Sequence, residues 1–300
     1  MDSTRITVKV PATSANMGPG FDCLGIALDM WNIVSVEVGG RGFEIYGHGE
    51  NELPRDESNL VWSSIARVFD EAGMEMPAMS LTCHNDIPTT RGLGSSSAAL
   101  VGGLVAGNEL CGSPFTKEEL LQIAADTEGH PDNVAPALFG GMQIAVSQDG
   151  RVVSAPVPFP EDLSSILYVP NTPMPTEEAR GLLKSEVPRS DAVFNIGRAA
   201  LLVRALATGD LEHLDIATDD RLHQPARQTI FFPMKNIIRA ALGAGALGAF
   251  LSGAGSTVLA FATEKEFTIG YEMADAAVKS GLSGEVVITR PTGLGAHTLT

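Results

Sequence analysis

A glycine- and serine-rich segment at residues 86–100 constrains this chain more than any other stretch. Two glycines, Gly92 and Gly94, flank a leucine, three serines follow, and a run of good helix formers begins at Ala98. Glycines allow backbone turns that a side chain forbids and let another group approach closely. A loop of this kind at a helix start presents unpaired N–H groups and the positive end of the helix dipole, which suit a phosphate. The segment therefore predicts a nucleotide-binding loop.

The segment matches none of the commoner phosphate motifs. No lysine follows its second glycine, so it is not G-x-x-x-x-G-K-[ST], and it is not G-x-G-x-x-G either. For an isolated segment, a plain glycine-rich turn that starts a helix is the alternative. The upstream Pro88 and the triple serine favour nucleotide binding.

Composition limits the class of protein. The chain has 300 residues, of which 44% are hydrophobic and 19% charged, as expected for one large globular domain or two modest ones. The net charge of −16 argues against nucleic acid or an acidic membrane surface as partner. A polyanionic ligand must therefore be held locally, by backbone amides, a metal ion and a few arginines.

Cysteine usage and the chain start favour a cytoplasmic protein. Cys23, Cys83 and Cys111 lie far apart without a C-x-x-C, so no disulfide framework or zinc site is predicted. The first five residues lack the basic-then-apolar pattern of a signal peptide. The uncharged stretch 240–263 is long enough to span a bilayer, but its many glycines favour a buried strand–loop–strand.

Hydrophobic periodicity predicts mixed strands and helices without the regular alternation of a doubly wound sheet. In the first half we expect strands over 6–10, 33–38, 79–83, 142–146 and 152–155, a loop over 11–22, and helices over 59–72, 97–110, 116–127 and 134–139. In the second half we expect strands over 165–169 and 284–289, and helices at about 176–184, 191–208, 210–219 and 234–243. A further helix to residue 280 is expected after a capping box at Thr263–Glu266. Prolines at positions 156, 158 and 160 place the predicted domain boundary between 1–155 and 156–300.

The segment Glu128–Asn133 is a second candidate for chemistry. A glutamate at a helix end and an Asp-Asn pair in a rigid Gly/Pro turn can hold Mg²⁺, which prefers one or two carboxylates with phosphate oxygens and water. The alternative is an ordinary helix-terminating turn, in which Asp and Asn bond their own backbone. His130 has no cysteine or second histidine near enough in sequence to indicate zinc.

Two further features are a second glycine loop and a pair of arginines. The loop, Leu251–Leu259, packs against the first loop, approaches the substrate, or is a tight strand connection, and spacing does not decide between these. Arg180 lies one turn into a predicted helix, and Arg227 follows the polar segment 221–225. Arginine can grip a carboxylate through two hydrogen bonds, although a solvated surface arginine is the usual case.

Together these segments resemble a family of small-molecule kinases. Residues 88–98 look like the ATP loop of the kinases of galactose, homoserine, mevalonate and phosphomevalonate, and Leu251–Ser256 resembles the C-terminal glycine motif of that superfamily. Three further segments, Val10–Asp22, Glu128–Ala137 and Asp220–Pro225, are similar to the homoserine kinases. Stretches at 176–180 and 191–195 also fit, and all occur in the expected order.

The resemblance implies ATP-dependent phosphorylation of the hydroxyl of L-homoserine, on the route to threonine. It implies an α+β fold of two domains, with a ribosomal-S5-like N-terminal domain and a ferredoxin-like C-terminal domain. Proteins of this type are commonly homodimers.

The resemblance also carries site residues to this chain. The implied ATP loop consists of Pro88, Thr89, Thr90, Arg91, Gly92, Leu93, Gly94, Ser95, Ser96, Ser97 and Ala98. A serine of the triplet, Ser96 in first place, would bind Mg²⁺ together with Glu128. The residues implied to surround homoserine are Asn16, Asp22, His130, Asp132, Asn133, Arg180 and Arg227. Asp22 or Asp132 suits the ammonium of homoserine, and the two arginines suit its carboxylate.

Asn133 is the most informative of these residues for the mechanism. Several sister kinases have an aspartate there that can serve as base, whereas an amide cannot take a proton at neutral pH. Catalysis would then rest on alignment of the hydroxyl and on charge stabilisation by Mg²⁺ and the helix N-terminus, with Asp132 as the alternative base. Arg91 stands at a variable position and is expected to touch phosphate or solvent.

Three other functions are alternatives to that of a homoserine kinase. A sister kinase could act on mevalonate or a sugar, but a sugar has no carboxylate for the two arginines. A non-catalytic sensor would be expected to lose the magnesium ligands, and both Ser96 and Glu128 are present. An unrelated metabolite-binding protein would not show these motifs in order.

Overall fold

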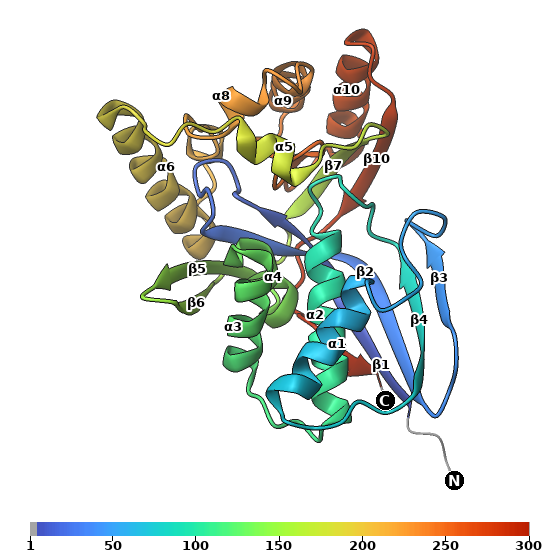
Figure 1. The fold of residues 1–300 in the computed structure, drawn as a ribbon. Coiled ribbons are helices and arrows are strands. Elements are labelled where there is room, and N and C mark those ends of the chain that lie inside the picture. The colour runs from blue at the N-terminus through green and yellow to red at the C-terminus, as the bar shows by residue number, and fades with distance from the viewer. Residues whose placement is uncertain (1–4, 300) are drawn as a thin grey trace.

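The computed structural model describes residues 5–299 and places them in two sheets with helices against each (Figure 1). The first sheet has seven strands with a main path β11-β1-β2-β4-β3, and β5 and β6 extend it from β2. The second sheet has four strands in the order β10-β7-β9-β8. The sequence start without a signal-peptide pattern falls mostly on residues 1–4, which lie outside the described residues.

The first sheet comprises β1 (Arg5–Ala15), β2 (Leu24–Val38), β3 (Phe43–Gly47), β4 (Met79–Asn85), β5 (Met142–Gln148), β6 (Arg151–Val157) and β11 (His297–Leu299). Its helices are α1 (Leu60–Glu71), α2 (Ser95–Leu110), α3 (Lys117–Glu128) and α4 (Pro131–Phe139). The second sheet comprises β7 (Ser164–Pro170), β8 (Gly248–Leu251), β9 (Val258–Ala262) and β10 (Gly284–Thr289). The helices of this half are α5 (Thr176–Gly181), α6 (Arg189–Thr208), α7 (Leu214–Ala217), α8 (Gln224–Arg227), α9 (Met234–Gly243) and α10 (Glu266–Lys279).

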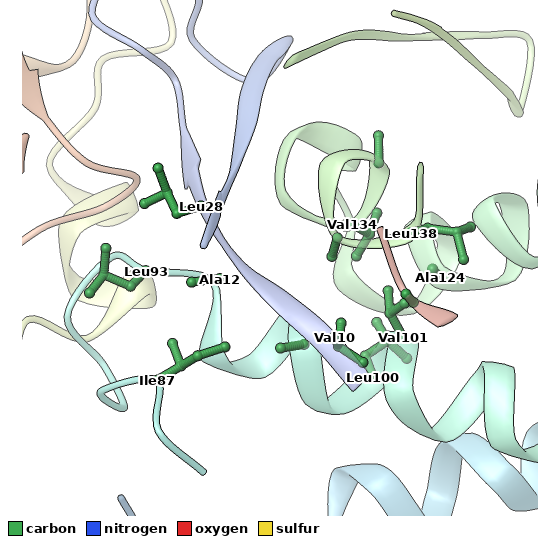
Figure 2. Packing of buried hydrophobic residues seen from close by; sticks show 14 of the residues in the cluster. Val10, Ala12, Leu28, Ile87, Leu93, Leu100, Val101, Ala124, Val134 and Leu138 are labelled. Atoms are coloured by element: carbon green, nitrogen blue, oxygen red, sulfur yellow. The ribbon is translucent and has the colours of Figure 1, made fainter. Parts of the chain in front are cut away.

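Helix α2 lies at the centre of the first half, and all of its residues from Leu100 to Asn108 are buried. Figure 2 shows Val10 of β1 against Leu100 and Val101 of α2, within one continuous apolar cluster. On its other side α2 approaches α1 closely, and a Cβ at Gly103 would lie 2.5 Å from the carbonyl oxygen of Val61. Packing on both sides fixes the axis of α2, and therefore the place of its N-terminal loop.

The end of β1 and the start of α10 differ from the sequence expectation, and β2 begins at Leu24, earlier than the expected 33. The residues over 11–15 were expected in a loop, but they continue β1 and pair with β2, with a register shift between Pro11 and Ala12. The capping box at Thr263–Glu266 does not form, and α10 begins after Lys265 without a side-chain cap. Its glutamate is instead held by Ser164, whose Oγ donates to Glu266 Oε1 at 2.9 Å.

Strands β3 and β11 and the short helix α8 were not expected from the sequence. Strand β11 returns from the end of the chain to pair with β1, so the first sheet contains residues from both halves. The proposed division at residue 155 stays a prediction.

The uncharged stretch 240–263 forms the end of α9 and then β8, a glycine loop and β9, so the expected buried strand–loop–strand is confirmed. Within residues 5–299, no helix combines the length and the apolar character needed to cross a bilayer.

Candidate active site

A polar cavity of about 220 Å³ lies where α2 begins and α5 approaches it. It is lined by the loop residues 90–97 and by most of the other predicted site residues, namely Asn16, Glu128, His130, Asp132, Asn133, Arg180 and Arg227. Asp22 touches this set through Arg180. Of the predicted ATP loop, Pro88, Thr89 and Ala98 do not line this cavity, and Thr89 lines a second cavity beside it.

The loop over residues 88–98, the predicted phosphate loop, takes its shape from two glycines with left-handed backbone. Gly92 has φ +74° and Gly94 has φ +68°, and a Cβ on Gly94 would lie 1.9 Å from Thr13 Oγ1. Gly94 is also the N-cap of α2, and no side chain caps the helix there. The first N–H groups of α2 are therefore free of a side-chain partner at the cavity, as an anion site requires.

The second glycine loop packs directly against the first. Ser252 Oγ donates to the carbonyl of Gly92 at 2.6 Å, and the N–H of Gly253 donates to Ala15 at 3.0 Å. The N–H of Thr257 donates to the carbonyl of Arg91 at 3.1 Å. The segment is thus both the tight connection between β8 and β9 and a contact of the first glycine loop, and its Gly253 and Ala254 line the cavity.

Arg91 anchors the phosphate loop to the second sheet. Its Nε donates to the carbonyl of Pro170 at the end of β7 at 2.7 Å, and its other nitrogens bond to the carbonyls of Asn171 and Thr89. The guanidinium therefore binds main-chain oxygens, where the sequence led us to expect phosphate or solvent.

Glu128 reaches the start of α2 because α3 ends immediately after it. Gly129 has left-handed backbone and terminates α3. Glu128 Oε1 accepts from Ser96 Oγ at 3.3 Å and from Ser97 Oγ at 3.2 Å, so the distances do not select one serine. A carboxylate and a hydroxyl beside a phosphate site are the donors that Mg²⁺ uses.

The donor set near Glu128 is sparse. No cluster of three or more histidine, cysteine, aspartate or glutamate side chains capable of holding a metal occurs in residues 5–299. Mg²⁺ usually keeps several waters and binds through one or two carboxylates together with phosphate oxygens, so it does not require such a cluster.

The segment Glu128–Asn133 is more than a terminating turn. Pro131 opens α4, and the side chains of Asp132 and Asn133 bond to other residues and not to their own backbone. His130 Nδ1 lies 3.2 Å from Asp132 Oδ1, and Asp132 is only 2% exposed. Burial opposes protonation of His130, but the hydrogen bond and charge of Asp132 outweigh it and raise the pKa of His130.

Arg227 is a buried cation that faces the cavity. It is 1% exposed, and its hydrogen bonds within the described residues go to uncharged acceptors, His223 Nδ1 at 2.8 Å and the carbonyl of Gly253 at 2.9 Å. Within residues 5–299, the Nε of Arg227 has no hydrogen-bond partner. Burial and the nearby Arg180 lower the pKa of Arg227 to about 10. A buried guanidinium without a bonded carboxylate calls for an anionic ligand.

Arg180 and Asp22 bind each other at the edge of the same cavity. Two hydrogen bonds of 2.6 and 3.2 Å join them. Asn16 positions Asp22, because its Oδ1 accepts from the N–H of Asp22 at 3.0 Å while its Nδ2 donates to Gly253 at 2.9 Å.

Sequence reasoning missed three residues that hold the site. Thr13 donates to Asn133, Asn195 donates to Asp220 and to the carbonyl of Pro19, and His223 bonds to Arg227. Asp220 and His223 lie in segments that matched the family, but their sequence context gives no sign of which side chain faces inward. Thr13 looked like part of a polar loop.

Comparisons with known proteins agree with the geometry. The family model described as "GHMP kinases N terminal domain" matches residues 59–141. The model described as "GHMP kinases C terminal" matches residues 202–277. A homoserine kinase of Desulfitobacterium hafniense is 42% identical over 294 residues, which are 97% of this chain and 99% of the relative. The chain belongs to the homoserine kinase family. A second member, from Caldicellulosiruptor bescii, is 43% identical over 279 residues, 93% of this chain and 89% of the relative.

Solved structures extend this result to the fold. The crystal structure of homoserine kinase from Cytophaga hutchinsonii has a TM-score of 0.88 at 30% identity, covering 98% of this chain and 97% of that one. The mevalonate kinase of L. major, solved with R-mevalonate, has a TM-score of 0.67 at 16% identity and shares the fold. Membership of the homoserine kinases confirms the expectations of a kinase and of a two-domain α+β fold.

Proposed function

We propose that this chain transfers the γ-phosphoryl group of ATP to the side-chain hydroxyl of L-homoserine, giving O-phospho-L-homoserine and ADP. The observation that carries the choice of substrate is Arg227, a buried guanidinium that faces the cavity and whose hydrogen bonds within residues 5–299 go to uncharged acceptors. A substrate with a carboxylate can satisfy that charge, whereas a sugar cannot.

The nucleotide occupies two adjoining cavities in this proposal. The triphosphate lies on the loop 90–97 and on the first N–H groups of α2. The adenosine enters the neighbouring cavity of about 290 Å³, which shares Thr90, Ser95 and Ser96 with the first. Apolar side chains such as Ile45, Leu53 and Leu60 line that cavity and suit a purine ring.

Glu128 and the hydroxyl of Ser96 or Ser97 would hold Mg²⁺ in this arrangement. Bound Mg²⁺ neutralises charge that develops on the phosphate oxygens during transfer. The proximity of Glu128 to both serines supports this assignment.

Homoserine is held by its two charges. Its carboxylate lies against Arg227 and Arg180, and its ammonium against Asp22, which replaces the internal pair of Asp22 and Arg180 by pairs with the substrate. With its carboxylate and ammonium both paired, homoserine directs the hydroxyl at the end of its side chain toward the phosphate loop.

Phosphoryl transfer then needs alignment and a place for one proton. The hydroxyl oxygen bonds to the γ-phosphorus while the bond from that phosphorus to the bridging oxygen of ADP breaks. We assign the hydroxyl proton to Asp132, because Asp132 and Glu128 are the carboxylates in the cavity lining and Glu128 is engaged with the serines. His130 hydrogen-bonds to Asp132 and orients it.

We also propose that the chain acts as a homodimer in the cytoplasm. Helix α6 exposes Val193 by 63% and Ile196 by 69%, an apolar surface suited to a second copy. The three cysteines are free thiols, in keeping with a reducing compartment.

Identification of the product tests the proposed reaction. The protein is incubated with MgATP and L-homoserine, and the mixture is followed by ³¹P NMR. We expect a phosphomonoester signal coupled to the two hydrogens of the adjacent methylene group, growing with ADP. Inorganic phosphate and ADP without a phosphomonoester would contradict transfer to the hydroxyl.

A further inference from the structure

Thr13 lies behind the active site and not in it. It belongs to β1, is completely buried and does not line the cavity. Its Oγ1 donates to Asn133 Oδ1 at 2.8 Å, across 120 positions of sequence. Asn133 itself lines the cavity. The hydroxyl of Thr13 is therefore linked to the cavity through the amide of Asn133.

The surroundings of Asn133 select one orientation of its amide. A threonine hydroxyl can donate or accept, so Thr13 alone would tolerate either orientation. A carboxylate only accepts, and Asp132 Oδ1 lies 3.5 Å from Asn133 Nδ2. Rotating the amide by half a turn would bring its oxygen against that carboxylate. Thr13 and Asp132 together therefore hold the Asn133 oxygen against the buried Thr13 and place its Nδ2 on the side of Asp132, which lines the cavity.

Thr13 is itself held firmly. Its N–H donates to the carbonyl of Leu93 in the phosphate loop at 3.1 Å, and its backbone pairs with Ala27 of β2. The absent Cβ of Gly94 leaves the space that the Thr13 hydroxyl occupies, because a Cβ there would lie 1.9 Å from Oγ1. A β-branched side chain in a strand also has few rotamers. The strand, the phosphate loop and Asn133 therefore meet at one hydroxyl.

We propose that Thr13 is a positioning residue for phosphoryl transfer, which rests on the function proposed above. By occupying the oxygen of the Asn133 amide, Thr13 fixes Asn133 as a hydrogen-bond donor toward the oxygens between which the phosphoryl group moves. Negative charge develops on those oxygens during transfer, and a preorganised donor stabilises it. Asn133 then takes no proton, and that task is left to Asp132.

The test is a double-mutant cycle on Thr13 and Asn133. Thr13→Val removes the hydroxyl at nearly constant volume, Thr13→Ala removes it in a smaller side chain, and Thr13→Ser retains it. Each is made alone, and Thr13→Val is also combined with Asn133→Ala. Thr7→Val is the matched control, because Thr7 lies on the same strand and bonds to Ser35, away from the cavity. For each protein we measure kcat, the KM of both substrates and the melting temperature.

We expect Thr13→Val and Thr13→Ala to lower kcat by roughly 10- to 100-fold, the scale of a misplaced catalytic group, with little change in either KM. Thr13→Ser should restore kcat to within about threefold of the unmodified chain, since the donor returns. In the Asn133→Ala background, Thr13→Val should have no further effect on kcat, because Thr13 acts through Asn133. Thr7→Val should leave kcat unchanged.

Two results would overturn the role of Thr13 while leaving the proposed function standing. One is a kcat of Thr13→Val or Thr13→Ala equal to that of the unmodified chain. The other is the same loss of kcat from Thr13→Val whether or not Asn133 is present, which would indicate a general structural effect. Absence of turnover with L-homoserine in the unmodified chain would instead overturn the proposed function, and the role of Thr13 with it.

Discussion

Asp22 and Arg180, which are 158 positions apart in the sequence, bind each other through two hydrogen bonds at the edge of the cavity. Their side chains are 35% and 33% exposed, so a ligand can reach both. Homoserine carries a carboxylate and an ammonium group and can exchange this internal ion pair for two pairs with itself. A substrate with one charge could satisfy only half of the exchange.

Replacing Arg180 by glutamine should therefore weaken homoserine binding more than catalysis. We expect the KM for homoserine to rise by roughly 10- to 100-fold, because one partner of a partly desolvated charge pair is lost. Steady-state kinetics with saturating ATP measures this. Arg67→Gln is the control, since Arg67 pairs with Glu71 on the exposed surface of α1 and should not affect KM. An unchanged KM in Arg180→Gln would remove Arg180 from the substrate site.

Glu128→Gln should raise the Mg²⁺ concentration needed for half-maximal activity by about 10-fold or more. The physical reason is loss of the carboxylate that faces Ser96 and Ser97. The measurement is a Mg²⁺ titration of the initial rate at fixed ATP, after removal of metal with a chelator. Glu118→Gln, at the exposed opposite end of the same helix, serves as control. Identical titration curves for Glu128→Gln and the unmodified chain would exclude Glu128 as a metal ligand.

The elements that carry the site could be predicted from sequence where the signal is local. The capping box of Thr116 and Glu119 starts α3 as expected, because both of its hydrogen bonds join residues three apart. The expected box at 263–266 does not form, because α10 begins only at Glu266, and that glutamate accepts from Ser164, 102 positions away. Local helix and capping propensities carry no information about a partner so far away in the sequence.

The contacts within the site depend on tertiary structure in the same way. Ala12, Thr13 and Ser14 are small or polar and resemble a loop, yet pairing with β2 and complete burial make them a strand. The family resemblance brought Asn133 into the site, but the partner that orients it lies 120 positions earlier. Sequence motifs therefore identified most cavity-lining residues, and folding was needed to show which of them bond to each other.

Gly94→Ala should abolish ATP binding because it distorts the phosphate loop. Its Cβ would collide with Thr13 Oγ1, and its φ of +68° is strained for alanine. We expect loss of measurable ATP binding by calorimetry. Gly112→Ala is a matched control, because Gly112 has φ +80° but no atom within 4 Å of its Cβ position. It should cost only about 1–2 kcal/mol of backbone strain and retain ATP binding. Normal ATP affinity in Gly94→Ala would contradict the loop geometry.

His223 should make the folded state less stable in acid. Burial lowers the pKa of His223 from 6.5 to about 4 in the folded chain. As the pH falls through this window the unfolded chain takes up the proton first, so the free energy of unfolding decreases. Urea unfolding at about pH 7 and about pH 5 measures the decrease, and His223→Gln should show a smaller one. An equal decrease in both proteins would mean that other groups are responsible.

The most direct measurement is ADP release from MgATP with a panel of alcohols: L-homoserine, D-homoserine, L-serine, L-threonine, mevalonate and galactose. The buried Arg227 and the exchangeable pair of Asp22 and Arg180 predict turnover with L-homoserine far above that with mevalonate and galactose, which lack the ammonium group. Preference for mevalonate or galactose would contradict the assigned substrate. Tight ATP binding without turnover of any alcohol would contradict the assignment as a kinase of small amino alcohols.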